Sequence, residues 1–259
     1  MRDLTWLKRH TAEENGVQVA DVTSAYAVLS IMGPNSRKLL SKLTDEDLSN
    51  DHFPFGTGKE IEIGYSIALA LRVTYVGELG WELYIPSEFA QDLYDRLLEA
   101  GKEMGLKHAG MHALNSLRLE KAYRHWGHDI TDEDTPLEAG LSFAVAWDKS
   151  GGFLGREALI RKKENGLLKK RMVQFALENP EPLLYHNEPI WCGNTIVGDT
   201  TSGMYGHSIG SCLGMGYIEN PDGINKEWIE SQKFEIEVAG ERYPAKASLK
   251  AFYDPGNAR

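Results

Sequence analysis

The last third of the chain alternates short apolar segments with turn residues, and this pattern restricts the fold more than any other feature. Five strands are predicted after residue 170: 172–177, 196–201, 214–218, 234–238 and 245–249. The pairs Gly193-Asn194 and Ala239-Gly240 suit tight hairpin turns. Such a series is typical of a small all-β barrel or sandwich. We therefore expect a C-terminal β-barrel domain at 171–259, which the charged stretch 161–170 separates from a region at 1–160.

The region before the barrel mixes strand-like and helix-like patterns. Apolar and β-branched residues predict strands at 17–22, 26–31, 61–65, 71–75, 81–85 and 141–147. Apolar residues at helical spacing predict helices at 33–43, 86–104, 111–123 and 156–164. The strands at 71–75 and 81–85 would form a hairpin with the connection 76–80. The expected fold class is α+β, with mixed sheet-and-helix structure followed by the barrel.

The charge balance argues against several classes of partner. Lys and Arg number 28 and Asp and Glu 38, so the formal net charge is −10. A chain this acidic lacks the dense positive charge that binds nucleic acid or an anionic membrane surface. No apolar run approaches the ~20 residues that span a bilayer. The start MRDLTWLKRH has no signal-peptide core and the only cysteines are Cys192 and Cys212, so we expect a cytoplasmic protein with free thiols.

The segment from Tyr75 to Glu82 is the first candidate binding site. Its glycines, Gly77 and Gly80, let the backbone approach a flat ligand closely. Glu82 would lie on the strand face opposite Trp81, where a carboxylate could accept two parallel hydrogen bonds from the amidine-like edge of a pterin or guanine ring. Periodicity alone favours the alternative, an ordinary hairpin with an exposed glutamate.

The predicted helix at 111–123 carries the second candidate. Four residues share one face of that helix: Met111, Asn115, Arg118 and Ala122. An arginine among small and apolar neighbours is expected to be partly buried beside an anionic partner. That partner is either an internal carboxylate, such as Glu120 or Glu138, or the carboxylate of a ligand. The internal carboxylate is the safer expectation.

The segment after this helix offers two further interpretations. His125, His128 and Asp129 are residue types that bind metals, but no additional Cys or His spacing completes a site, so packing or exposed histidines are favoured and no metal is expected. Trp126 beside Gly127 could instead form a stacking wall for an aromatic ligand.

A G-x-S-x-G pattern surrounds Ser208. In a serine hydrolase this pattern lies between a strand and a helix, whereas the residues after Ser208 predict a loop and a strand. A loop of the barrel is therefore favoured over a hydrolase nucleophile. The sequence also contains no P-loop, no H-E-x-x-H and no G-x-G-x-x-G.

Four segments together resemble the aminomethyltransferase family, which is the family of the glycine-cleavage T-protein: RVTYVGELGWELYIP, HALNSLRLEKAYRHWGHDI, TPLEAGLSFAVAWDKSGGFLGREAL and TTSGMYGHSIGSCLGMGYI. They follow the family's order and extend over nearly the whole chain. They are most similar to the tetrahydrofolate-binding C-terminal half of dimethylglycine and sarcosine dehydrogenases. The resemblance implies part of a cloverleaf of three subdomains, with a tetrahydrofolate site near its centre.

The resemblance also implies folate-binding residues. Tyr75 and Glu82 match the tyrosine and glutamate that line the family's pterin pocket. Arg118 matches the arginine of its R-L-E motif, and Trp126 the aromatic residue of its next motif. No catalytic residue is identified, because the family's aspartate near folate N5 lies in a segment of roughly a hundred residues, the scale of a domain, that we expect this chain to lack.

The expected function is one-carbon transfer to tetrahydrofolate, which forms 5,10-methylenetetrahydrofolate, by a transferase of the aminomethyltransferase type. It would work with a partner chain, such as a flavoprotein amine dehydrogenase. The alternative is a non-catalytic folate-binding or interaction subunit of a split dimethylglycine or sarcosine dehydrogenase. The family's iron–sulphur-assembly relatives rank last, because their K-G-C-Y-x-G-Q-E motif is replaced at 148–157. An open sheet edge would favour a homo-oligomer or partner binding.

Overall fold

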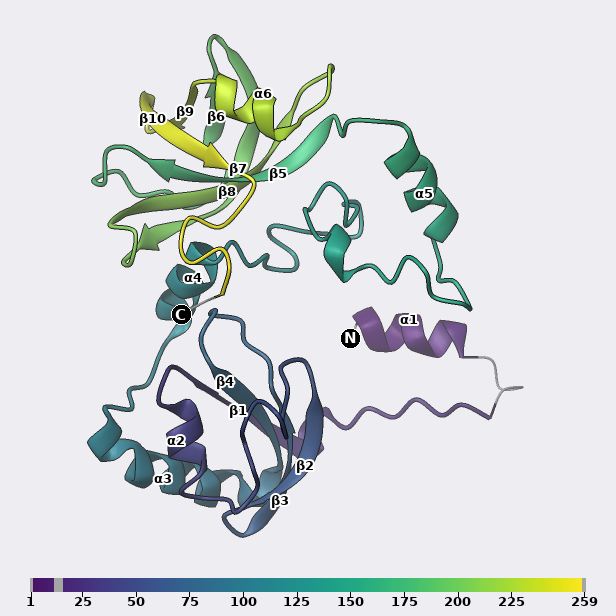
Figure 1. The fold of residues 1–259 in the computed structure, drawn as a ribbon, viewed down its shortest axis with the longest axis vertical. Helices are drawn as coiled ribbons and strands as arrows, with labels where there is room; N and C mark the ends of the chain where they lie inside the picture. The colour runs from purple at the N-terminus through teal and green to yellow at the C-terminus, as the bar shows by residue number, and fades with distance from the viewer. Residues whose placement is uncertain (1, 12–15, 258–259) are drawn as a thin grey trace. The chain divides into compact units, whose positions relative to one another are not determined.

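The structure is a computed structural model that describes residues 2–11 and 16–257. The chain forms two compact units, whose elements Figure 1 labels. Unit 1 comprises Met1–Thr74 and Glu78–His108, and unit 2 comprises Tyr75–Gly77 and Ala109–Arg259. The domain limits expected from composition, 1–160 and 171–259, stay a prediction.

Unit 1 is built on a four-stranded antiparallel sheet with the strand order β1-β4-β3-β2. The strands are β1 (Tyr26–Met32), β2 (Gly58–Ile63), β3 (Ser66–Leu71) and β4 (Gly80–Pro86). The helices α2 (Ser36–Leu40) and α3 (Ala90–Gly101) cover one face of this sheet (Figure 1). The other helical elements of the unit are α1 (Arg2–His10), η2 (Thr23–Ala25), η3 (Ser87–Phe89) and η4 (Lys102–Met104).

Alternation along the strands builds the core of unit 1. Trp81, Leu83 and Ile85 of β4 are fully buried, and they pack with Leu93 and Leu97, which lie one turn apart on α3. The opposite face of the sheet is less covered. The period-two pattern of 81–85 and the apolar stripe of the predicted helix are therefore confirmed.

Several predicted elements of unit 1 are wrong in extent or kind. Residues 17–22 form no strand, because their backbone pairs with no strand among the described residues. β3 ends at Leu71 because the chain turns at Arg72, where the Val73 amide donates to the Leu71 carbonyl at 3.1 Å. The expected strand 71–75 and its five-residue connection are therefore replaced by a longer irregular segment. The helix predicted at 33–43 is shorter, at α2.

Unit 2 contains a closed antiparallel barrel with the strand order β10-β5-β8-β7-β6-β9. Its strands are β5 (Lys170–Leu177), β6 (Pro189–Cys192), β7 (Thr195–Gly206), β8 (Ser211–Glu219), β9 (Phe234–Val238) and β10 (Glu241–Ser248). The helical elements are α4 (Met111–Glu120), η5 (Ser142–Ala144), α5 (Arg156–Glu164) and α6 (Lys226–Ser231). The predicted barrel is thus confirmed, together with the hairpin turn at Ala239-Gly240, where both residues have positive φ.

The barrel has an apolar interior and carries α4 on its outside. Phe175, Ile190 and Ile236 are fully buried in the interior. Leu119 of α4 packs with Leu213 in a separate buried cluster on the barrel wall. This second cluster fixes α4, and therefore the residues that follow it, against β7 and β8.

Two predictions for unit 2 need correction, and two elements were missed. The segment 141–147 is a turn around η5 rather than a strand, because the Trp147 ring nitrogen donates back to the Ser142 carbonyl at 3.1 Å. The helix predicted at 111–123 ends at Glu120. β6 and α6 were not predicted.

No helix of the described residues combines the length and the apolar character that crossing a membrane requires.

Candidate functional site

The segment from Tyr75 to Glu82 is divided between the two units. Tyr75–Gly77 belongs to unit 2, and Glu78 begins the second part of unit 1. Gly77 has a φ of +76°, and a Cβ at this position would overlap the side chain of Lys121. Lys121 cannot move aside freely, because its buried ammonium group lies 3.1 Å from the Asp254 carboxylate. A glycine at position 77 is therefore required for the close packing of this segment in unit 2.

Glu82 lies on the sheet face of unit 1 opposite Trp81, as the period-two pattern predicts. Its side chain is partly buried, and its Oε2 accepts a hydrogen bond from the Tyr84 hydroxyl at 3.1 Å. Burial, together with this bond and the charge of Glu82, raises the pKa of Tyr84. Among the described residues, Tyr84 is the only hydrogen-bond partner of the Glu82 carboxylate. The carboxylate therefore keeps acceptor capacity for a ligand.

Tyr75 packs within unit 2. Its hydroxyl donates to the Arg124 carbonyl at 2.9 Å, and its ring stacks near Tyr123 with the centroids 6.3 Å apart. Burial raises the pKa of Tyr75. The tyrosine is therefore a neutral, positioned aromatic ring beside the end of α4.

Arg118 is buried, and its anionic partner is internal. Its Nη1 lies 3.0 Å from Oδ2 of Asp129, and the two side chains are 5% and 0% exposed. The guanidinium also donates to Asn115, to the Tyr123 carbonyl and to the Ser202 hydroxyl at 2.9–3.0 Å. The expectation of an internal carboxylate is confirmed.

The named candidates for that carboxylate were wrong. Glu120 accepts from Ser208 and Glu138 pairs with Lys162 at 2.6 Å, so neither binds Arg118. The partner Asp129 follows α4 after a turn, and helical spacing does not reveal such a contact.

Asp129 holds the turn that contains Trp126. The carboxylate of Asp129 accepts from the His125 amide at 2.7 Å and from the Thr201 hydroxyl at 2.5 Å. Gly127 has a φ of +89°, and its amide donates to the Ile130 carbonyl at 2.8 Å. Trp126, at the tip, is 57% exposed. The hydrogen bonds of Asp129 thus hold the base of the turn, and the Trp126 indole at its tip has the exposure that stacking on an aromatic ligand requires.

The histidines of this turn do not gather with Asp129 into a metal site. The rings of His125 and His128 stack with the centroids 4.6 Å apart. Burial lowers the pKa of His125, and the nearby charges of Arg118 and His128 lower it further, against the opposing effect of Asp129. Asp129 is committed to its hydrogen bonds. No group of three metal-binding side chains occurs in the part of the chain that the structure describes.

Ser208 lies in the turn between β7 and β8, so the barrel-loop interpretation is confirmed. Its hydroxyl donates to Oε2 of Glu120 at 2.9 Å, and its amide donates to Oε1 at 2.5 Å. Glu120 is buried on α4. The serine therefore ties the β7–β8 turn to α4, and within residues 2–11 and 16–257 no hydrogen bond joins its hydroxyl to a histidine.

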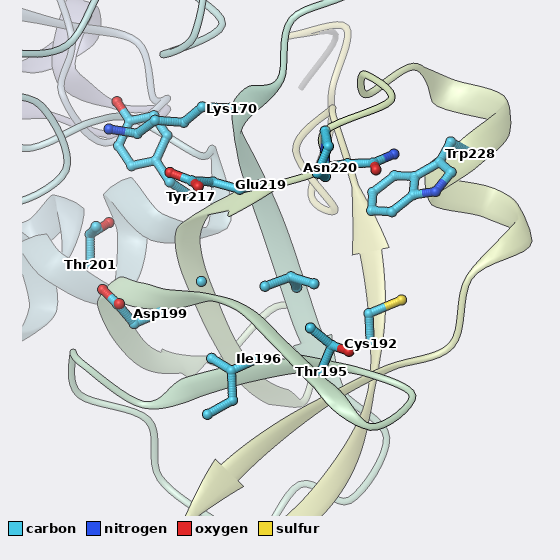
Figure 2. Close-up of a pocket in the computed structure, with 13 residues that line it drawn as sticks. Lys170, Cys192, Thr195, Ile196, Asp199, Thr201, Tyr217, Glu219, Asn220 and Trp228 are labelled. Carbon is cyan, nitrogen blue, oxygen red and sulfur yellow. The ribbon is translucent and has the colours of Figure 1, made fainter.

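A groove on the barrel wall was not foreseen from the sequence. It has a volume of about 790 Å3 and is lined by residues of β5, β6, β7, β8 and α6 (Figure 2). Asp199, Glu219 and Trp228 line it. Thr201, which hydrogen-bonds Asp129, also lies on its wall. None of the residues predicted to bind folate lines this groove.

Two family models match the chain. The GCVT N-terminal domain matches residues 1–149, and the glycine cleavage T-protein C-terminal barrel domain matches residues 170–254. The crystal structure of glycine cleavage system aminomethyltransferase T from Bartonella henselae shares the fold, with a TM-score of 0.70 and 24% identity. That match covers 85% of this chain and 57% of the other.

Curated relatives are similar over most of this chain. 4-Methylaminobutanoate oxidase (formaldehyde-forming) of Paenarthrobacter nicotinovorans is 43% identical over 254 residues, which cover 98% of this chain and 30% of the relative. Mitochondrial dimethylglycine dehydrogenase of Homo sapiens is 39% identical over 95% of this chain and 28% of its own length. Aminomethyltransferase of Caldanaerobacter subterraneus is 36% identical over 85% of this chain and 57% of its own length. The chain therefore spans about 30% of the length of the first two.

Proposed function

The chain belongs to the glycine cleavage T-protein family, and from this premise we propose that it binds tetrahydrofolate and takes part in one-carbon transfer to it. In this reaction a folate amine captures a one-carbon unit at the oxidation level of formaldehyde, and the product is 5,10-methylenetetrahydrofolate. The observation that carries the proposal is the free acceptor capacity of the partly buried Glu82 carboxylate.

Glu82 would bind the pterin edge. A pterin offers two parallel N–H donors, which match a carboxylate in a charge-assisted pair. β4 fixes the backbone of Glu82 between β1 and β3, opposite Ser30 and Leu71. The Tyr84 hydroxyl occupies one side of Oε2 and restricts the rotation of the carboxylate. The group is therefore oriented before a ligand arrives, which lowers the entropic cost of binding.

Two aromatic side chains of unit 2 are separate candidates for contact with folate. We propose that Tyr75 and Trp126 contact the flat parts of the folate. Arg118 would act in the site mainly by fixing Asp129 and hence the Trp126 turn, since most of its donors are already used inside the unit. These proposals rest on the geometry within each unit.

We propose a transferase activity that requires a partner. The relatives named oxidase or dehydrogenase are more than three times as long as the region that matches this chain, because that region covers 28–30% of their length. A flavoprotein amine dehydrogenase would oxidise the amine and deliver the one-carbon unit. The second candidate function is a folate-binding subunit of such an enzyme without activity of its own.

Calorimetric titration with 5-formyltetrahydrofolate tests the binding proposal. Micromolar affinity corresponds to about −8 kcal/mol. Glu82→Gln keeps the shape of the side chain but loses one acceptor and the charge, so we expect a loss of about 1.5–3 kcal/mol, a ten- to hundredfold weaker Kd. The matched control is Glu62→Gln on β2, an exposed glutamate of the same sheet, which should leave the Kd unchanged. Equal affinities for all three proteins would contradict the role of Glu82.

A second assay separates the two candidate functions. The chain is mixed with sarcosine, tetrahydrofolate, an electron acceptor and a purified flavoprotein that oxidises sarcosine but has no folate-binding half, and 5,10-methylenetetrahydrofolate is measured against free formaldehyde. A transferase should raise the folate product at the expense of formaldehyde. Folate binding without that change would favour the non-catalytic subunit.

A further inference from the structure

Two arginines of unit 1 converge on one amide oxygen. Arg37 lies on α2, and its Nη2 donates to Oδ1 of Asn50 at 2.6 Å. Arg72 follows β3, and its Nη2 donates to the same Oδ1 at 2.8 Å. Each guanidinium group is therefore one hydrogen bond away from the same oxygen. Two positive charges held this close repel each other, and burial strengthens the repulsion.

Backbone carbonyls and an indole ring hold both guanidinium groups in place. Nε of Arg37 donates to the Leu48 carbonyl at 2.9 Å, and Nη1 of Arg72 donates to the Phe53 carbonyl. The guanidinium carbons of Arg37 and Arg72 lie 5.8 and 5.6 Å from the centroid of the Trp81 ring. Carbonyls and rings stabilise a cation but bring no negative charge of their own. The pair is therefore positioned without being neutralised.

The charge of the pair lacks an anionic partner. In the part of the chain that the structure describes, no carboxylate forms an ion pair with Arg37 or Arg72, whereas Arg96 of the same unit pairs with Asp92 at 2.7 Å. Arg72 is only 9% exposed. Burial lowers the pKa of Arg72, and the charge of Arg37 lowers it further. A bound anion would offset the free energy that this arrangement costs.

The acidic side chains nearby in the sequence are engaged elsewhere or exposed. Asp47 pairs with His52 at 2.8 Å, and Glu46 pairs with Lys59 at 3.1 Å. Asp51 is exposed and, among residues 2–11 and 16–257, forms no ion pair with either arginine. The anion must therefore come from outside the described residues.

We propose that Arg37, Arg72 and Asn50 form a binding site for a phosphate group. Both guanidinium groups keep unused N–H donors, and Nδ2 of Asn50 donates to no atom of the described residues. Arginine forks match the oxygens of phosphate with parallel hydrogen bonds. A phosphate monoester carries a charge of about −1.5 to −2 at pH 7, which balances two guanidinium groups better than one carboxylate does.

This site is separate from the residues proposed to bind folate. Both arginines lie beside Trp81, whose side chain is on the sheet face opposite Glu82. The group recognised is phosphate, either as the inorganic ion or as a monoester. The two sources are distinguished by experiment.

Thermal unfolding of the full chain at increasing inorganic phosphate and constant ionic strength tests the site, because a ligand of the folded state raises the Tm. We expect saturation with an apparent Kd of about 1 mM. Arg37→Gln should raise this Kd at least tenfold. The matched control is Lys38→Gln, which removes the same charge from an exposed neighbour on α2 and should leave the Kd unchanged. Phosphate also stabilises proteins without binding, so equal responses of all three proteins would overturn the proposal.

The indole N–H signal of Trp81 in the wild-type chain provides an independent readout by nuclear magnetic resonance. A phosphate bound by the two arginines changes the charge beside this ring, so the signal, assigned with Trp81→Phe, should shift saturably. No shift at about 50 mM phosphate would overturn the proposal, whether or not Arg37→Gln folds.

Parallel titrations with acetate and glycerol 3-phosphate identify the ligand. Acetate should bind at least tenfold more weakly, and affinity equal to that of phosphate would contradict the assignment. Tighter binding of glycerol 3-phosphate than of inorganic phosphate would support the site and indicate a monoester, and the reverse order would support it and indicate the free ion. No folate is present in these experiments, so their outcome is independent of folate binding.

Discussion

Asp129→Asn should destabilise unit 2 by about 3–5 kcal/mol, the usual cost of removing one charge from a buried ion pair. The substitution keeps the shape of the side chain but leaves the Arg118 guanidinium uncompensated at 5% exposure. The amide oxygen can replace Oδ2, which accepts from Arg118 and from the His125 amide, and the amide nitrogen can then donate to the Thr201 hydroxyl, which also lies 3.2 Å from the Met215 carbonyl. The expected cost therefore comes from the uncompensated charge of Arg118 at a buried position.

Urea unfolding of the full chain, followed by circular dichroism and tryptophan fluorescence, measures this cost. Arg118→Met and the double variant complete a cycle, in which the double variant should cost less than the sum of the single ones. The matched control is Glu230→Gln on α6, whose pair with Lys226 is 60–71% exposed and should contribute at most about 0.5 kcal/mol. If Asp129→Asn costs less than about 1 kcal/mol, the same as a surface pair, the buried network does not hold the turn.

Three further substitutions test other parts of the structure. Gly77→Ala places a Cβ at a positive φ and against the Lys121 side chain, so it should lower the unfolding free energy by about 1–3 kcal/mol. The control is Gly151→Ala, whose Cβ meets no atom within 4 Å. Equal shifts in the unfolding free energy for the two variants would refute the packing argument. Burial lowers the pKa of His125 in the folded state. The contribution of the neutral imidazole to stability is therefore fully present above pH 6.5 and is lost as the pH falls toward the folded-state pKa. His125→Gln should flatten the fall in Tm between about pH 7.5 and 5.5, and an unchanged slope would show that His125 does not cause that fall. Glu120→Gln replaces one of the two carboxylate oxygens that accept from Ser208 with an amide NH2 donor, and it should cost about 1–3 kcal/mol in urea unfolding, against about 1 kcal/mol for Ser208→Ala. Negligible costs for both variants would contradict the two bonds.

Local patterns predicted the elements whose neighbours are also local. β4, α3 and most of the barrel strands follow from periodicity and turn residues, because each has a covered face that its own sequence marks. The segments 17–22 and 141–147 have strand-like composition, yet they pair with no strand among the described residues. Strand formation requires a distant partner, and composition does not say whether one exists.

The candidate site was predictable to a similar degree. The orientation of Glu82 follows from alternation with Trp81. The burial of Arg118 was predicted correctly, but the helix face used to predict it is wrong at both ends, because Met111 is 64% exposed and Ala122 lies beyond the end of α4. The identity of its partner did not follow, because Asp129 reaches Arg118 only after the helix ends and the chain turns at Gly127. Such contacts depend on loop geometry, which spacing along the chain does not encode.

The closed barrel has a consequence for the time course of folding. Closure requires β10 to pair with β5, for example Ala245 with Leu177, so the first and last strands of the barrel meet across about 70 residues of chain. Contacts between such distant residues form slowly, because the intervening chain loses conformational entropy before the pairing contributes favourable free energy. Until β10 arrives, β5 and β9 are unpaired edges open to pairing with another molecule. A chain in which β10 has not yet paired with β5 therefore leaves the β5 edge open to pairing with another molecule.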